Sequence, residues 1–416
     1  MTIQDITPMA VKDCLIRTAK RFPITIGFTT AFAIFAMAMV WHPDMLEEST
    51  KIDVLCYLAE GILLSMALKF WDERTGKSHL WQQVVAHVLL LAVAVAWYFI
   101  GYLGYGLVTA HLSIFISLLM ACVFLPFREE EDDIPACNFG AHLVKSSLIA
   151  PIAGLVPTLL LCMLVSISFP IFFDIEASEE DYLSIVIFFQ VVFPMLLFLS
   201  RIVKGKRMTN RLINVSDWVD KFAKVILIPA AAIYMIILYC YECHIALAWE
   251  LPNGGVSYLV AVMMGLFFIV ETYLYFTNHA GDKETTGWFL RWLPLMIMPL
   301  LLLMSIGIYR RISDYGLTAS RLYLATLNVW FYIVCFFMLR TKMKRINWIP
   351  TSFCIIFMLT SVLPVNYHSI AKNYIINDLN KKAAQWDKMD GWEKDEWNSR
   401  VWYMKNYYDI EYKAKQ

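Results

Sequence analysis

Long apolar runs constrain the fold of this chain more than any other feature of its sequence. A helix of about 20 apolar residues crosses a hydrocarbon core about 30 Å thick. About eleven such runs follow one another, with no soluble domain between them. They cover approximately residues 22–41, 53–71, 83–103, 107–127, 144–171, 182–201, 223–247, 256–276, 288–309, 321–340 and 348–367.

These runs predict an all-α, polytopic helical membrane bundle of about eleven transmembrane helices. Lipid offers no partner to an unpaired backbone group, and the runs are continuous rather than alternating, which disfavours a β-barrel. The run 144–171 is longer than the others and holds Pro151, Pro157 and Pro170. It predicts either one kinked span or a span with a re-entrant piece.

The composition agrees with a membrane protein and excludes several classes. Hydrophobic residues make up 59% of the chain and charged residues 17%, against about a quarter charged in globular domains. The formal net charge is zero. We therefore expect the lipid bilayer as the main partner, no nucleic-acid partner, and neither a disordered chain nor an ordinary soluble enzyme. Protein partners cannot be read from the sequence.

The basic residues are distributed unevenly, and this predicts an orientation. With the N-terminus in the cytoplasm, 22 of the 35 Lys and Arg fall in inner segments, 4 in outer loops and 9 in the C-terminal tail. An odd number of spans then gives an N-in, C-out protein of a bacterial inner membrane. The expected parts are a cytoplasmic segment 1–21, a transmembrane domain 22–367 and an extracytoplasmic tail 368–416.

The tail changes character and becomes rich in Trp and Tyr. Aromatic and apolar residues recur there at helical spacing, with charges between them, which predicts an amphipathic helix, with a break at Gly391 as an alternative. Such side chains prefer the membrane–water interface, so we expect the tail to lie against the outer face or to cap the bundle. The recurring residues are Trp386, Met389, Trp397, Val401, Met404 and Tyr408.

Three of the four basic residues in outer loops lie in one short stretch. Arg310 and Arg311 precede Asp314, and Arg321 follows. One interpretation is internal pairing with Asp314 together with helix capping. The other is a site for phosphate, carboxylate or a lipid head group, because the arginine fork binds such anions bidentately.

Four polar residues inside the runs fall in the outer half of the bilayer by the same orientation: Glu60, His111, Gln190 and Asn328. Ionisable groups in lipid are costly and are functional candidates by default. They are predicted to line a cavity that opens outward, with the arginines at its mouth. The alternative is that they join helices through hydrogen bonds. Glu271 lies near the inner end of its run, so we expect it to snorkel to the interface.

The stretch Cys240-Tyr241-Glu242-Cys243-His244 matches the attachment pattern of c-type haem. A redox-active cysteine pair and ordinary interfacial residues are alternatives. A single copy with no haem domain around it favours the ordinary interpretation. We therefore predict no cofactor and no metal site.

The arginine stretch also carries a family resemblance. The pattern R-x-x-[DE]-Y-G-[LI]-T-x-x-R is present at 311–321, and Asn328-Val329-Trp330-Phe331 follows it. With its multi-span layout, the chain resembles the bacterial membrane proteins known as domain of unknown function 4153, especially those of Bacteroidota. The resemblance implies a bacterial inner-membrane location and carries over no catalytic or binding residues.

Three functional hypotheses follow. The first is a transporter, a flippase-like protein or a channel component for an anionic or lipid-linked ligand, with Glu60 as the coupling carboxylate. The second is a sensor or assembly protein that uses the tail. The third is a membrane-embedded enzyme, with His111 or Glu60 as general base and the arginines as a phosphate clamp. The sequence holds no H-E-x-x-H, P-loop or G-x-S-x-G motif, so an enzyme is the least favoured.

Overall fold

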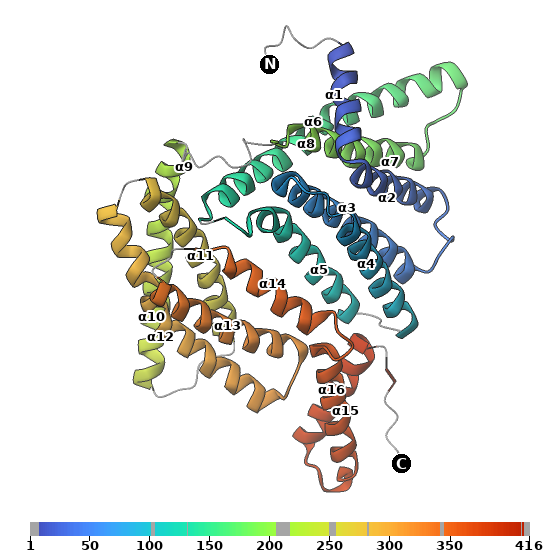
Figure 1. Cartoon of the computed structure of the whole chain (residues 1–416). Helices are drawn as coiled ribbons and strands as arrows, with labels where there is room; N and C mark the ends of the chain where they lie inside the picture. The colour runs from blue at the N-terminus through green and yellow to red at the C-terminus, as the bar shows by residue number, and fades with distance from the viewer. Residues whose placement is uncertain are drawn as a thin grey trace. The chain divides into compact units, whose positions relative to one another are not determined.

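The computed structural model describes residues 8–100, 105–130, 132–204, 217–248, 255–280, 283–341, 345–408 and 410–411. Within these ranges the secondary structure is helical, with no strand. Ten of the described helices are long and apolar enough to cross a membrane. This confirms the predicted all-α membrane bundle. Figure 1 shows the helices in chain order.

The chain forms two compact units. Unit 1 comprises residues 1–103 and 111–211, and unit 2 comprises residues 104–110 and 212–416. The sequence did not predict this division of the transmembrane region. The helices of unit 1 are α1 (Pro8–Arg21), α2 (Pro23–Trp41), α3 (Glu48–Thr75), α4 (Leu80–Ile100), α5 (Tyr105–Phe124, whose first turns group with unit 2), η2 (Leu125–Phe127), α6 (Ile134–Phe173), α7 (Glu179–Ile187), η3 (Phe188–Val192) and α8 (Phe193–Arg201).

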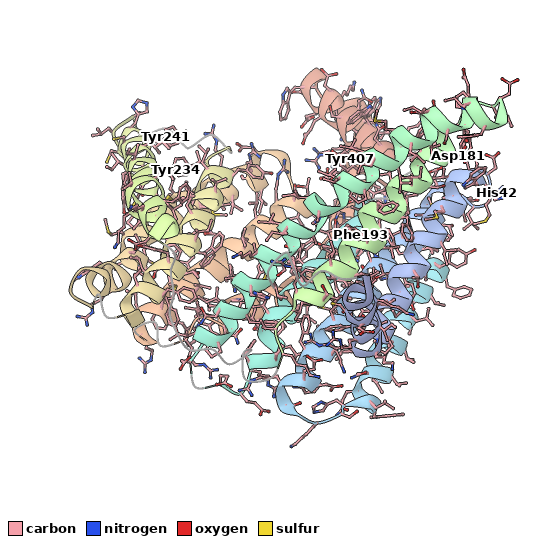
Figure 2. All side chains as sticks on the ribbon, turned by 90° about the horizontal axis from the view of Figure 1, so that it is seen from above. His42, Asp181, Phe193, Tyr234, Tyr241 and Tyr407 are labelled. Atoms are coloured by element: carbon pink, nitrogen blue, oxygen red, sulfur yellow. The ribbon has the colours of Figure 1, made fainter. Side chains whose placement is uncertain are left out.

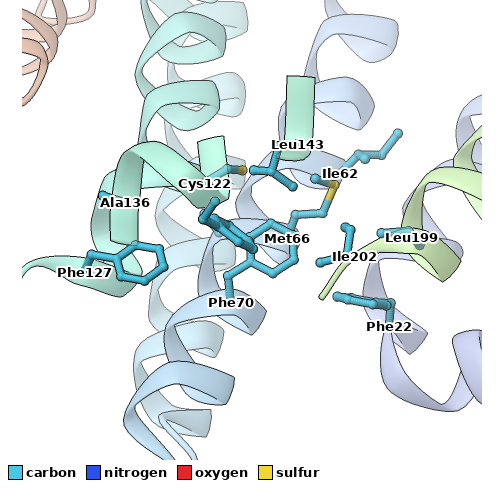
Figure 3. Packing of buried hydrophobic residues seen from close by; sticks show 12 residues of the cluster. Phe22, Ile62, Met66, Phe70, Cys122, Phe127, Ala136, Leu143, Leu199 and Ile202 are labelled. Carbon is cyan, nitrogen blue, oxygen red and sulfur yellow. The ribbon is translucent and has the colours of Figure 1, made fainter. Parts of the chain in front are cut away.

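The core of unit 1 is built around one stripe of α3. Ile62, Met66 and Phe70 recur every four residues, so they share a face of the helix. Phe70 packs edge-on against Phe22 at 6.0 Å and against Phe139 at 5.3 Å between ring centroids. Figure 3 shows this cluster, to which α5, η2, α6 and α8 also contribute. The stripe fixes the rotation of α3 and therefore the direction in which its polar residues point.

One end of unit 1 gathers two acidic loops, 42–47 with Asp44 and Glu47, and 174–178 with Asp174 and Glu176. Helices α2 and α7 pack together, and Trp41 Nε1 donates to Ser184 Oγ at 3.0 Å. Figure 2 labels His42 at the end of α2 and Asp181 at the start of α7. The two acidic loops therefore lie at the same end of this unit.

Unit 2 is organised around α11, α12 and α13, which are neighbours in space. Tyr234 of α10, labelled in Figure 2, donates to the Leu259 carbonyl of α11 at 3.0 Å. The helices of unit 2 are α9 (Asp217–Phe222), η5 (Ala223–Leu227), α10 (Ile228–Ala248), α11 (Val256–Ala280), α12 (Lys283–Tyr315), α13 (Ala319–Thr341), α14 (Trp348–Ser361), α15 (Tyr367–Ala383), η6 (Trp386–Lys388) and α16 (Gly391–Tyr408).

Two predicted spans differ in detail from the structure. The run 144–171 belongs to one continuous helix, α6, which has all three prolines inside it, so no re-entrant piece is present. The run 348–367 contains only the 14-residue helix α14. At 1.5 Å per residue α14 is about 21 Å long, shorter than a hydrocarbon core. The N-in, C-out orientation, which rests on an odd number of spans, stays a prediction.

The tail is a helical hairpin rather than a single amphipathic helix. Helices α15 and α16 pack against each other (Figure 1). Trp386 and Trp397 meet at 5.1 Å between ring centroids, and Trp397 Nε1 donates to the Leu379 carbonyl at 3.4 Å. Most of the recurring aromatic and apolar residues therefore pack inside the hairpin. The buried cluster consists of Ile375, Leu379, Met389, Trp397 and Met404.

Candidate functional site

The predicted site residues fall into two groups, one in each unit. Glu60, His111 and Gln190 belong to unit 1. Arg310, Arg311, Asp314, Arg321 and Asn328 belong to unit 2. The single outward-opening cavity expected from the sequence stays a prediction.

Glu60 and His111 form a buried pair in unit 1. Helix α3 supplies Glu60, which is 2% exposed, and α5 supplies His111, which is 6% exposed. Nδ1 of His111 lies 2.8 Å from Oε1 of Glu60. The hydrogen bond forms whether the proton sits on the imidazole nitrogen or on the carboxyl oxygen. The pair is therefore built to share one proton away from water.

Asp53 extends this pair, and sequence reasoning missed it. Its Oδ1 lies 3.7 Å from Nε2 of His111, and its side chain is 32% exposed. That distance is too long for a direct hydrogen bond but is short enough for an ionic contact. Asp53 precedes Glu60 by seven residues, two turns of α3, so the spacing could have placed both carboxyls on one face. His111 thus lies between a buried and a partly exposed carboxyl.

Two aromatic contacts hold the neighbourhood of this pair in place. Trp97 of α4 packs edge-on against His111 at 5.1 Å between centroids and is itself buried. Next to Glu60, Gly61 leaves room for Phe28 of α2, whose ring a Cβ at this position would overlap. Helices α2 and α4 therefore restrict the movement of α3 and of the imidazole.

Gln190 lies in η3, a π-helical segment between α7 and α8. Its Nε2 donates to Thr158 Oγ1 of α6 at 3.2 Å, and that hydroxyl donates to the Gly154 carbonyl at 2.7 Å. These contacts match the alternative interpretation, in which polar groups join helices. π-Helical turns are also frequent at functional sites.

Asn328 joins two helices of unit 2. It is buried on α13, and its Nδ2 donates to Ser305 Oγ of α12 at 2.6 Å. Ser305 Oγ is also 3.2 Å from the hydroxyl of Tyr332. Asn328, Ser305 and Tyr332 therefore form a polar row between α12 and α13.

The arginine stretch is mostly helical rather than a loop. Helix α12 continues to Tyr315, so Arg310 and Arg311 lie in its last turns, where the helix dipole favours cations. Arg310 Nε donates to Asp314 Oδ2 at 3.3 Å, an exposed pair four residues apart. Arg311 lies over the ring of Tyr258, 5.8 Å from its centroid. The Arg310–Asp314 contact fits the internal-pairing interpretation.

Arg321 connects this stretch to the C-terminal hairpin. Gly316 ends α12 with a φ of 77°, a left-handed conformation that favours glycine, and Arg321 Nη1 donates to its carbonyl. A Cβ at Gly316 would lie 3.1 Å from Nη2 of Arg400 on α16. Arg311 and Arg400 both act electrostatically on Arg321. Sequence reasoning missed Arg400, because its position depends on how the hairpin folds back.

Arg400 is also bound within the hairpin. It donates to Asp378 of α15 and to Glu396, the latter at 2.6 Å, and Lys382 donates to Glu396 at 2.8 Å. Burial opposes ionisation of Glu396, but these two cations hold its pKa below the usual value of 4.5. The hairpin is therefore held by charge as well as by its apolar cluster.

Glu271 departs from its predicted role. The expectation that it snorkels is wrong, since Glu271 is 2% exposed and lies inside unit 2. By contrast, Cys240 and Cys243 are exposed free thiols on α10. Among the described residues, no group of His, Cys, Asp and Glu is arranged to hold a metal ion.

Comparisons with known proteins place the chain in a family. Residues 15–383 match the family described as domain of unknown function 4153. An uncharacterized protein of Pasteurella multocida is 24% identical over 378 residues, which are 87% of this chain and 60% of that protein. The chain thus matches less than two thirds of the length of this relative. No solved structure matches it.

The relative comes from Pasteurella, and the narrower resemblance to proteins of Bacteroidota stays a prediction. The family match covers most of the chain, and ten described helices can cross a membrane. The chain therefore belongs to the domain of unknown function 4153 family and is a multi-pass membrane protein.

Proposed function

We propose that this protein is a proton-coupled transporter or flippase-like protein for an anionic or lipid-linked ligand in the bacterial inner membrane. The observation that carries the proposal is the hydrogen bond of 2.8 Å between His111 and the buried Glu60. Asp53, at 3.7 Å from the other imidazole nitrogen, would connect the pair to the surface. A histidine between two carboxyls is suited to receive a proton on one nitrogen and release it from the other.

Arginines of unit 2 support an anionic ligand. Arg311 and Arg321 lie at the junction of α12 and α13, with Arg400 beside them. Arginine forks fit phosphate and carboxylate groups, and a neighbouring like charge makes an anion more favourable there. In this proposal unit 1 carries the proton and unit 2 recognises the anion. Glu60 is the coupling carboxylate and His111 the residue that loads and unloads it.

Proton flux in liposomes tests this function. The full chain is reconstituted with a pH-sensitive dye inside, and flux is driven by an inward gradient of inorganic phosphate. A second arm uses vesicles with phosphatidylglycerol in one leaflet and measures its transfer under a pH gradient. We expect proton-coupled movement in one arm, which identifies a free anion or a lipid head group as the ligand.

Matched variants locate the proton path. Glu60→Gln and His111→Asn should each reduce coupled flux at least tenfold, since either change breaks the proton-sharing pair. His87→Asn is the control, because His87 is a half-buried histidine of α4 that contacts Phe28 and the Gln83 carbonyl instead. Flux that survives both Glu60→Gln and His111→Asn, or its absence from the wild-type chain in both arms, would contradict the proposal.

A sensor or assembly role for the tail is the second candidate. Trp392 and Trp402 of α16 are 69% and 63% exposed, and exposed tryptophan side chains prefer the membrane–water interface. They would contact lipid head groups or a protein partner. Quenching of tryptophan fluorescence by brominated lipids, compared between the wild-type chain and Trp392→Ala/Trp402→Ala, tests the membrane contact. Equal quenching in the two proteins would argue against it.

A further inference from the structure

Glu271 of α11 is the one described carboxylate whose two oxygens are both buried and without a hydrogen-bond partner among the described residues. Its side chain is on a helix that packs against α12 and α10. An ionised carboxylate in an apolar interior without a partner is very costly, and a neutral acid is much less so. A buried carboxyl group in this position therefore requires a bound proton or another cation.

The direction of the side chain follows from its neighbours. Phe268, three residues earlier on the same face of α11, packs against Trp330 at 5.6 Å and Phe331 at 6.1 Å, both on α13. One turn further along α13 lies Cys335, which is fully buried and within electrostatic range of Glu271. Glu271 therefore faces α13 in the interior of unit 2.

The same face of α13 carries the polar row described above. Asn328, Tyr332 and Cys335 follow one another at spacings of four and three residues, which is one helical stripe. Ser305 joins the first two by hydrogen bonds of 2.6 and 3.2 Å. The stripe leads from the outer half of the predicted span toward the carboxyl group of Glu271.

Several titratable groups on the elements around α11 have partners of their own. Asp220 accepts a hydrogen bond of 2.7 Å from Tyr273 and pairs with Lys224 at 3.1 Å. Tyr234 and Tyr239 of α10 donate to backbone carbonyls. Cys335 is a neutral thiol neighbour rather than a cation. None of these groups supplies a positive charge to Glu271.

From this geometry we infer that Glu271 is a proton-binding site of unit 2, occupied by a proton in the resting protein and reached along the stripe Asn328–Tyr332–Cys335. This site is separate from the Glu60–His111 pair and does not rest on the transport function proposed above. It supplies a second place where the membrane-embedded chain can take up and release a proton.

Infrared difference spectroscopy of the full chain in lipid at pH 7 tests the inference. Subtracting the spectrum of Glu271→Gln from that of the wild-type chain should leave the carbonyl band of one neutral carboxylic acid, which shifts in D2O. The matched control is Asp314→Asn, which removes an exposed carboxylate paired with Arg310 and should leave the bands of an ionised group. Glutamine has the shape of glutamate, so the fold is preserved.

The opposite result would overturn the inference. Loss of ionised carboxylate bands in Glu271→Gln would mean that the site holds no proton. If those bands also moved when Na⁺ was replaced by Li⁺, the occupant would be a metal cation instead. The route is tested by the rate at which the acid band shifts in D2O. Tyr332→Phe should slow this shift several-fold. Ser257→Ala changes a buried serine off the stripe and should leave the rate unchanged. Equal rates in the two variants would refute the route.

Discussion

Two glutamates, one in each unit, are equally buried and differ in their partners. Glu60 of α3 and Glu271 of α11 are each 2% exposed. Glu60 shares a hydrogen bond of 2.8 Å with His111, whereas neither oxygen of Glu271 has a partner among the described residues. Two glutamates with the same exposed fraction are therefore expected to have opposite effects on the free energy of unfolding.

The difference teaches how a membrane interior can hold an acid. At Glu60 the hydrogen bond with His111 offsets part of the desolvation cost. At Glu271 no described residue offsets that cost, and in our inference a bound proton neutralises the group. Loss of His111 should therefore destabilise the protein, whereas loss of the carboxyl group of Glu271 should stabilise it.

Breaking the Glu60–His111 pair should have the largest effect. His111→Leu leaves a buried carboxyl without its partner and is expected to lower the free energy of unfolding by about 3 kcal/mol. The double variant Glu60→Leu/His111→Leu should lose less than the sum of the single changes, with a coupling of about 2 kcal/mol. Unfolding in detergent, followed for all four members of this cycle, measures both quantities.

Additive effects in that cycle would show that the two residues do not stabilise each other. His142→Leu serves as a control for loss of an imidazole, because its Nε2 contacts the Arg201 carbonyl rather than a carboxylate.

Replacing each glutamate by leucine should give effects of opposite sign. Glu271→Leu removes an unpartnered polar group and is expected to raise the free energy of unfolding by about 1–2 kcal/mol. Glu60→Leu leaves Nδ1 of His111 unpaired and should lower it by a similar amount. The shift of the unfolding midpoint relative to the wild-type chain decides the sign. A loss of stability in Glu271→Leu would reveal a ligand or partner at that carboxyl.

The sequence identifies buried acids more readily than it distinguishes partnered from unpartnered ones. Glu60 and His111 are visible as polar residues in apolar runs, but they are 51 residues apart, and their contact depends on how α3 and α5 pack. Glu271 is visible too, yet its place near the end of a run suggests an exposed group. Only the packing of Phe268 on α13 shows that this face is turned inward.

The same limit applies to the ends of the helices. The length of the apolar runs predicts most spans within a few residues. The extension of α12 through Arg310 and Arg311 depends on Gly316, whose left-handed φ of 77° ends the helix. The fold of the tail depends on contacts such as Trp397 with Leu379, which join residues from two helices. Composition alone does not contain these contacts.

A third acid, Glu396, has charged partners, lies outside the predicted spans and should show the smallest effect in this comparison. Lys382 and Arg400 hold the pKa of Glu396 below 4.5, so its contribution to stability is present above the pKa of the unfolded chain and is lost as the pH falls through the folded value. Water screens this group, and we expect a contribution of less than about 1 kcal/mol.

Lowering the pH from 7 to 4 should therefore loosen the α15–α16 hairpin slightly, which the rate of proteolysis within η6 measures. The Glu396→Gln variant should be cleaved faster at pH 7 and should lose part of this pH dependence. The control is Glu411→Gln, because the carboxyl of Glu411 is 71% exposed and lies 3.6 Å from Lys405. This variant should behave like the wild-type chain. An unchanged pH profile in Glu396→Gln would mean that the apolar cluster alone holds the hairpin.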